Sequence, residues 1–508
     1  MKFGAKYLVC VAFLLSSVLL CGAAFAANPD ASGKKAKDTI TLLVQSEPAT
    51  LDPAYANNDN ITIILQFVYD DLFTLLPDGD YGLELIESYE PIDDTTIKFK
   101  LKKGILFSDG SQLKPSDILW HISRLQASPV SASLYGFVDL EKSTVEDDLN
   151  FTLKFKQPWA PFTNSFSVGR GSIPSKAAFE AMGEEKFARN PVGTGPYKFV
   201  KWVAGTQIEL TRNEHYWGEP AKTENIVIKF IEEPTARVIE LETGAADIAY
   251  YIEGSDIGRV NNIGGYHIEQ GDSYRYFNVV LSMKEPLFRD ERVRWAMSHA
   301  IDKEALADTA SDGVGTVING FAPPAMAGYK EMTPIPYDLE KAKQLMAEAG
   351  FADGFEIDLH VESQSIFEKT AEALQAMWSE IGINANIVSS PLATYEAQHG
   401  GLFQASVRDG TATEISNVLI IYESRFGSRM NGNDDWLDAK LLELRTYYYG
   451  DPKRTQCLDE IFDHIYKIRY TYPYMVMPTV YGVRDKLAGF VFHPAQDHID
   501  ASKWVVYE

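Results

Sequence analysis

Cysteine is scarce in this chain of 508 residues, which has only three. Two of them, Cys10 and Cys21, lie within the first 26 residues, a segment with the features of an export signal. The mature chain then keeps Cys457 alone, so no intramolecular disulfide can form and packed cores must supply the stability. The 482 residues that remain after residue 26 suffice for about three folding units.

The chain also lacks an apolar run long enough to serve as a membrane anchor. The run over residues 7–20 is shorter than the roughly 20 residues that a membrane-spanning helix needs. Two lysines precede this run and Ala24-Phe25-Ala26 follows it, which is the order of a secretory signal peptide cleaved after Ala26. Cys21 follows the large Leu20, where a lipidation signal needs a small residue, so no lipid anchor is expected.

Basic residues are few relative to acidic ones. The chain has 47 lysines and arginines against 71 acidic residues, a net charge of −24. Removing the two signal lysines leaves 45 basic residues and a net charge of −26. This charge excludes nucleic acid and anionic membrane surfaces as natural partners. An acidic surface that keeps an exported monomer in solution is the simplest interpretation, and charge alone identifies no ligand.

Catalytic signatures are missing as well. The sequence has no H-E-x-x-H, G-x-S-x-G or C-x-x-C motif, and its nine histidines are scattered without the spacing of metal ligands. The adjacent pairs Asp70-Asp71 and Asp434-Asp435 are expected to be solvated, and Cys457 is expected to be a buried apolar thiol in a helix. The sequence therefore predicts no enzyme, no metal and no cofactor.

The chain does show strands that alternate with helices. Residues 27–38 are polar and aperiodic, which predicts a flexible leader, and a β-branched run then predicts the first strand over 39–45. Later helices are expected over 236–243, 290–299, 339–349 and 368–381, and strands over 355–361 and 383–388. This alternation is typical of α/β sheets.

Six segments, in a fixed order, carry a resemblance to a known family. They are LDP at 51–53, KGILFSDGSQLKPSDI at 103–118, NPVGTGPYKFVKW at 190–202, RNEHYWG at 212–218, RDERVRWAMSHAIDKEAL at 289–306 and YDLEKAKQLMAEAGF at 337–351. With them, almost the whole mature chain resembles the family 5 extracellular solute-binding proteins, the peptide, nickel and related binding subunits of ABC importers.

The resemblance implies a two-lobed α/β periplasmic-binding-protein fold with a hinge and an extra subdomain inserted in the first lobe. It places lobe I at 39–78, 199–280 and 485–508, the inserted subdomain at 79–198, and lobe II at 281–484. The implied function is capture of a short peptide, modified amino acid or other small organic solute between the lobes. The loaded protein, located in the periplasm, would then deliver the solute to the transmembrane subunits of an ABC permease.

The resemblance also directs attention to the loop over 403–416, FQASVRDGTATEIS. Peptide-binding members carry there a tryptophan and, three residues later, an aspartate that holds the α-amino group of the peptide. Arg408 and Thr411 match these two positions, so the usual ammonium anchor is absent. Asp409 or Glu414 would have to replace it with shifted geometry.

Arg408 has a forked pair of donors suited to a carboxylate or phosphate. Two interpretations stay open: Arg408 binds an anionic group of the ligand, or it pairs internally with Asp409 or Glu414. Arg170, between Gly169 and Gly171, is a second candidate ligand residue, with a simple surface turn as its alternative.

Tyrosines supply candidate aromatic walls for an organic solute. Tyr55 lies in the first loop, and Tyr274 and Tyr276 share one face of a strand that passes between the lobes. The family's GTGPY at 193–197 is interpreted as a turn, and Arg294 with Asp302 as structural supports of a helix.

Rival functions on the same fold are capture of a nickel chelate or haem, with His215, His299 and His399 as possible contributors, and a non-transport enzyme.

Overall fold

The computed structural model describes residues 36–56, 59–167, 169–392, 394–395, 403–424, 434–495 and 498–507. The signal peptide expected over 1–26 and most of the expected leader lie outside these ranges. Within them, no helix is long and apolar enough to span a membrane.

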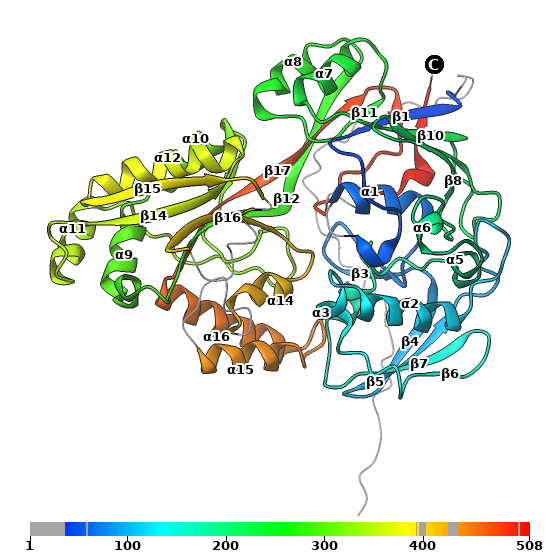
Figure 1. The fold of residues 1–508 in the computed structure, drawn as a ribbon, viewed down its shortest axis with the longest axis horizontal. Coiled ribbons are helices and arrows are strands. Elements are labelled where there is room, and N and C mark those ends of the chain that lie inside the picture. The colour runs from blue at the N-terminus through cyan, green and yellow to red at the C-terminus, as the bar shows by residue number, and fades with distance from the viewer. Residues whose placement is uncertain are drawn as a thin grey trace, which may run out of the picture.

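One mixed sheet of eleven strands runs through both halves of the molecule (Figure 1). Its order is β15-β14-β16-β12-β17-β11-β1-β10-β9-β8, and β13 pairs with β17. The strands are β1 (Thr39–Val44), β8 (Tyr197–Val203), β9 (Gln207–Arg212), β10 (Asn225–Phe230), β11 (Ile248–Ala249), β12 (Tyr266–Leu281), β13 (Thr316–Val317), β14 (Phe355–Glu362), β15 (Ile383–Ser390), β16 (Ala405–Thr411) and β17 (Thr471–Arg484).

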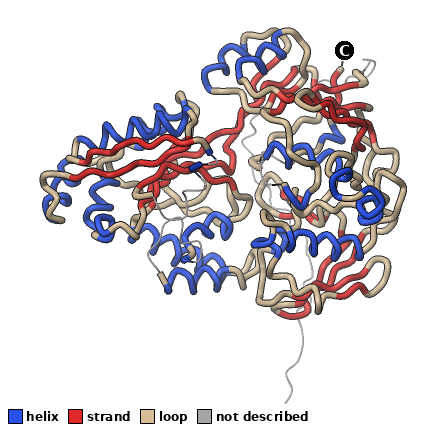
Figure 2. Tube along the Cα trace, in the orientation of Figure 1, coloured by secondary structure: helices blue, strands red, loops and turns tan. Residues whose placement is uncertain are grey.

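Two long strands join the halves. β12 has 16 residues and β17 has 14, and they pair with each other antiparallel. Figure 2 shows both crossing from the first half, which holds β1 and β8–β11, to the second half, which holds β14–β16. Their register shifts between Asp272 and Tyr276, and a shift of this kind bends a strand. Any motion of one half against the other must therefore deform these two strands.

The first half packs both faces of β1. Leu42 and Val44 lie in a core with α1 (Asp59–Val68), and Leu43 packs on the opposite face against α7 (Pro234–Glu242). A strand covered on both faces must be apolar almost throughout, which explains the run TITLLV. The strand predicted over 39–45 is therefore confirmed.

The first half also carries a separate four-stranded sheet in the order β4-β5-β7-β6. Its alternating strand TIKFKL buries Ile97, Phe99 and Leu101 in a separate core with residues of α2 (Pro115–Ala127). The remaining strands are β2 (Phe73–Leu75), β3 (Tyr81–Leu83), β4 (Ile86–Asp93), β5 (Thr96–Leu101), β6 (Thr144–Val145), β7 (Asn150–Lys154), β18 (Leu487–Ala488) and β19 (Val505–Val506).

Helices of the second half follow from amphipathic spacing. α12 (Ser365–Ser379) buries Phe367, Ala371, Leu374 and Trp378, one face of a helix, and the chain turns at Gly382 with φ +83°. The other helices are α2 (Pro115–Ala127), α3 (Ala132–Tyr135), α4 (Phe162–Ser165), α5 (Lys176–Met182), α6 (Glu184–Phe187), α8 (Ile257–Asn261), α9 (Glu291–His299), α10 (Lys303–Ser311), α11 (Leu339–Glu348), α14 (Ile415–Val418), α15 (Asp435–Leu444) and α16 (Pro452–Ile468).

Two structural expectations need correction. Arg294 and Asp302 both support the structure, as expected, but they do so separately: Arg294 donates to the carbonyls of Phe288 and Ile468, whereas Asp302 caps α10 (Lys303–Ser311) through the amide of Ala305. The pair Asp70-Asp71 is buried rather than solvated, with 4% and 2% of its residue surface exposed, because it follows α1 directly into the core. Cys457 is buried, as expected.

The turn at 193–197 depends on close approach to α1. A Cβ at Gly193 would lie 2.2 Å from the carbonyl oxygen of Val68 and 2.4 Å from Cδ1 of Tyr69. Gly193→Ala should destabilise the protein by about 1 to 3 kcal/mol through overpacking, seen as a lower Tm. Gly258→Ala is the control, because a Cβ there meets nothing within 4 Å. Equal Tm values for the two variants would contradict this account.

Candidate ligand-binding site

A cavity of about 140 Å³ lies where β12 and β16 meet the segment that follows β16. It is lined by Tyr276, Asn278, Val280, Arg408, Asp409, Gly410, Thr411, Ala412, Asn417, Val418 and Ile421. Its volume is below the roughly 300–1,000 Å³ of sites for drug-sized ligands, so it fits one end of a solute or a very small one.

The register of the two strands assembles the cavity wall. Arg408 lies directly opposite Asn278, and Gly410 lies opposite Tyr276. Opposed residues of antiparallel strands project to the same face, so β12 and β16 present these four residues together. A Cβ at Gly410 would come within 2.9 Å of the Tyr276 ring, so only glycine leaves room for that ring.

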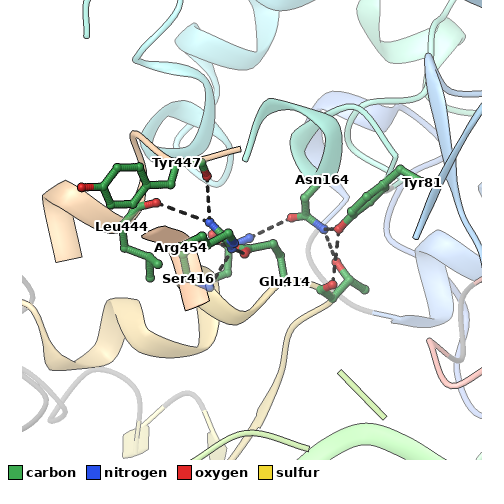
Figure 3. Close-up of polar contacts among 9 residues, drawn as sticks. Tyr81, Asn164, Glu414, Ser416, Leu444, Tyr447 and Arg454 are labelled. Carbon is green, nitrogen blue, oxygen red and sulfur yellow. Dashed lines mark hydrogen bonds and ion pairs between the residues drawn. The ribbon is translucent and has the colours of Figure 1, made fainter. Parts of the chain in front are cut away.

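The two carboxylates near Arg408 have other cationic partners. Asp409 accepts from Nε of Arg275 at 2.8 Å, and the buried Glu414 pairs with Arg454 (Figure 3). Glu414 also caps α14 by accepting from the amide of Ser416. The sequence left open a pairing of Arg408 with Asp409 or Glu414. In the structure, these two carboxylates pair with Arg275 and Arg454. The guanidinium of Arg408 lies over the ring of Tyr395, 5.6 Å from its centre.

Two asparagines of the wall were missed by sequence reasoning. Asn278 is 3% exposed, and its Oδ1 has no hydrogen-bond partner in the part of the chain that the structure describes. Asn417 lines the cavity from α14. Asn278 could have been found, because it lies two residues after Tyr276 and so shares its face. Asn417 could not have been identified from the sequence, since its position at the cavity depends on how α14 packs.

The structure brings four of the seven candidate ligand residues together: Tyr276, Arg408, Asp409 and Thr411. The other three lie elsewhere. Tyr274 is 1% exposed in an apolar core, and burial raises its pKa to about 12. The hydroxyl of the exposed Tyr55 donates to Glu184 at 2.7 Å. Arg170 donates from Nε to the carbonyl of Ala56 at 2.6 Å.

A second, larger cavity of about 480 Å³ lies in the first half. Aromatic rings such as Tyr69, Tyr250 and Trp504 line it together with Asp70 and Glu84. Asp70 accepts from Thr194 at 2.8 Å and from Trp217 at 2.7 Å.

Burial raises the pKa of Asp70 to about 6 and that of its neighbour Asp71 to about 8. These carboxyls therefore hold protons more tightly in the folded protein than in the unfolded chain.

The histidines proposed as ligands of a metal cargo do not lie close together in the described residues. His299 faces the carbonyl of Pro336 at 2.9 Å, and the ring of His215 lies beside Gly110. His399 lies outside the described residues. Across the described part of the chain, no group of three or more histidine, cysteine or carboxylate side chains is arranged to hold a metal ion.

Two halves joined by crossing strands, with a polar cavity next to the crossing, define the class of two-lobed solute-binding proteins. Comparison with known proteins gives the family. The family described as "Bacterial extracellular solute-binding proteins, family 5 Middle" matches residues 80–431 of this chain, and the chain belongs to that family. Members of this family are solute-binding proteins rather than enzymes, and they work with ABC permeases.

Individual relatives agree with this assignment. The glutathione-binding protein GsiB of Escherichia coli O1:K1 is 27% identical over 442 residues, covering 86% of this chain and 82% of that protein. CtaP of Listeria monocytogenes superposes with a TM-score of 0.83 at 21% identity, covering 93% of this chain and all of that one. NikA of Brucella suis, in complex with Fe(III)-EDTA, superposes with a TM-score of 0.83 at 21% identity, covering 92% and 100%. The expected two-lobed α/β fold is confirmed.

The buried acids predict a pH effect on stability. Between about pH 4 and pH 8 the folded protein binds more protons at Asp70 and Asp71 than the unfolded chain does, so the free energy of unfolding falls as pH rises. Asp71→Asn should lessen this fall, measured as Tm at pH 5 and pH 8. Glu185→Gln, which removes an exposed carboxylate, should leave it unchanged. An equal fall in wild type and Asp71→Asn would refute the effect.

Proposed function

We propose that this protein, as the binding component of an ABC importer, captures a small peptide-like or modified amino acid solute by an anionic group. The observation that carries the proposal is the position of Arg408, opposite Asn278 in the wall of the cavity. A half-buried guanidinium gives a carboxylate two parallel charge-assisted hydrogen bonds, and the cavity has room for such an end group.

The surrounding charges disfavour a free α-amino group at this position. Thr411, a hydroxyl, lies where the resemblance places the aspartate that holds an ammonium group. Asp409 and Glu414 each neutralise an arginine already. Drawing either carboxylate toward a ligand ammonium would break its ion pair with Arg275 or with the buried Arg454, which costs free energy.

The relatives suggest where to start. GsiB is named for glutathione, a peptide-like solute that carries carboxylates and so fits the chemistry of Arg408. Glutathione is the first candidate, and acidic peptides and opine-like acids are the next. A nickel chelate stays the second candidate on this fold, without a histidine cluster in the described residues to favour it.

The proposal includes the finer points of organisation. The signal peptide is removed after Ala26, and the mature monomer acts in the periplasm without a lipid anchor. Lobe I comprises 39–78, 199–280 and 485–508 with the inserted 79–198, and lobe II comprises 281–484. These boundaries fall at the ends of the two strands that join the halves, since β12 ends at Leu281 and β17 ends at Arg484.

Arg408→Ala should weaken binding of the anionic solute by about 1 to 3 kcal/mol, since a charge-assisted hydrogen bond is lost. Arg408→Lys should recover part of this, because a point charge replaces the fork. Calorimetry with glutathione and a panel of acidic and neutral peptides measures both variants. Arg259→Ala is the control, because Arg259 pairs with Glu242 in the first half. Strong binding of unmodified neutral dipeptides, with none of anionic solutes, would overturn the proposal.

A further inference from the structure

One buried amide joins the two halves beside the cavity. Asn164, on α4 of the first half, is 3% exposed. Its Nδ2 donates to Oγ1 of Thr413 at 2.6 Å and to the hydroxyl of Tyr81 at 3.1 Å, and its Oδ1 accepts from Nδ2 of Asn417 at 2.8 Å. Figure 3 shows Asn164 and Tyr81 facing the segment that holds Glu414. The amide of Asn164 thus uses both donors and its acceptor, two of the three bonds going to the other half.

The segment that Asn164 contacts is held firmly in the second half. Between Thr413 and Asn417, Glu414 pairs with Arg454 of α16, and both charged side chains are buried. Arg454 also donates to the carbonyls of Leu444 and Tyr447. The segment therefore moves with the second half as one body, and a shift of that half moves Thr413 and Asn417 away from Asn164.

Asn417 has a second role, because it also lines the cavity. One face of this residue is open to a solute and its Nδ2 holds Asn164. A solute in contact with Asn417 restrains its rotamers and thereby favours the orientation that reaches across to the first half. Occupancy of the cavity and closure of the halves thus share one side chain.

We propose that Asn164 is the positioning residue that couples occupancy of the cavity to closure, and that its bonds maintain a closed population even without solute. The coupling rests on the proposed function, since it takes the cavity as the solute site. The closed population without solute does not depend on the proposed function. A ligand then shifts an existing equilibrium toward the closed form.

Other contacts across the same interface limit how far a substitution of Asn164 can shift the equilibrium between the closed and open forms. The amide of Ala160 donates to the carbonyl of Arg445 at 2.8 Å, and the ring of Tyr81 lies 5.4 Å from that of Tyr449. Phe162 likewise contacts Tyr448, with ring centres 6.3 Å apart. These contacts survive substitution of Asn164, so its loss should shift the equilibrium without abolishing closure.

The distance between the halves can be measured by pulsed electron paramagnetic resonance on the chain beginning at Ala27. Spin labels go on Glu141→Cys in the inserted part and Lys343→Cys on α11, both exposed and on different halves. The native Cys457 is 2% exposed, and burial raises its pKa to about 11, so it reacts slowly with the label. No solute is added, so the result is independent of which solute the protein binds.

Asn164→Ala should lower the ratio of closed to open molecules about fivefold or more, the loss expected from two cross-half hydrogen bonds. Tyr81→Phe removes one hydroxyl of the same network and should lower the ratio of closed to open molecules by a smaller factor. This milder variant also serves as the test if Asn164→Ala does not fold. Asn190→Ala is the control, since the side chain of Asn190 donates to the carbonyl of Lys186 within its own segment of the first half.

Identical distance distributions for wild type, Asn164→Ala and Tyr81→Phe would overturn the proposal. A wild-type protein that is wholly open without solute would overturn it too. Failure here is separable from failure of the proposed function, because loss of solute binding in Arg408→Ala is measured independently.

Discussion

The antiparallel ladder between β12 and β17 is the constraint on which the rest of this structure depends. It is the hydrogen-bonded connection that carries one sheet through both halves, and its register shift near Tyr276 lies beside the cavity. A strand bends most readily at such a shift, which makes the shift a candidate hinge between the halves. The cavity wall is built on the same strand, so the element that bends also carries residues of the candidate ligand site.

Local elements could be predicted from the sequence because short-range patterns encode them. The expected helix over 339–349 is α11, which ends at Glu348 before Gly350 in the left-handed region, and the strand expected over 383–388 is β15. The pairing of Arg408 with Asn278 is different in kind. It joins residues 130 positions apart, and the β16 register that creates it is set by packing of the whole second half.

Burial of charge was the harder prediction for the same reason. Asp70-Asp71 reads as a solvated pair because adjacent carboxylates repel each other and prefer water. In the fold they follow α1 into the core, where the indole of Trp217 and the hydroxyl of Thr194 satisfy Asp70. Likewise, the sequence offers Glu414 as a candidate ligand anchor, whereas in the fold Glu414 pairs with the buried Arg454. Partners distant in sequence decide whether an acid serves structure or ligand.

The proposed capture of an anionic solute by this acidic protein must depend on local charges. With a net charge of −24, the chain repels an approaching anionic solute at long range, but that repulsion is screened beyond about 8 to 10 Å at physiological salt. Close to the cavity, Arg408 contributes a positive charge to the wall, and the neighbouring acids Asp409 and Glu414 pair with Arg275 and Arg454. In the proposed function, closure removes water and lowers the local dielectric, which strengthens the attraction between Arg408 and an anionic group of the solute. Under this proposal, selectivity comes from the closed state, so the contacts that hold the halves together bear directly on which solute is captured.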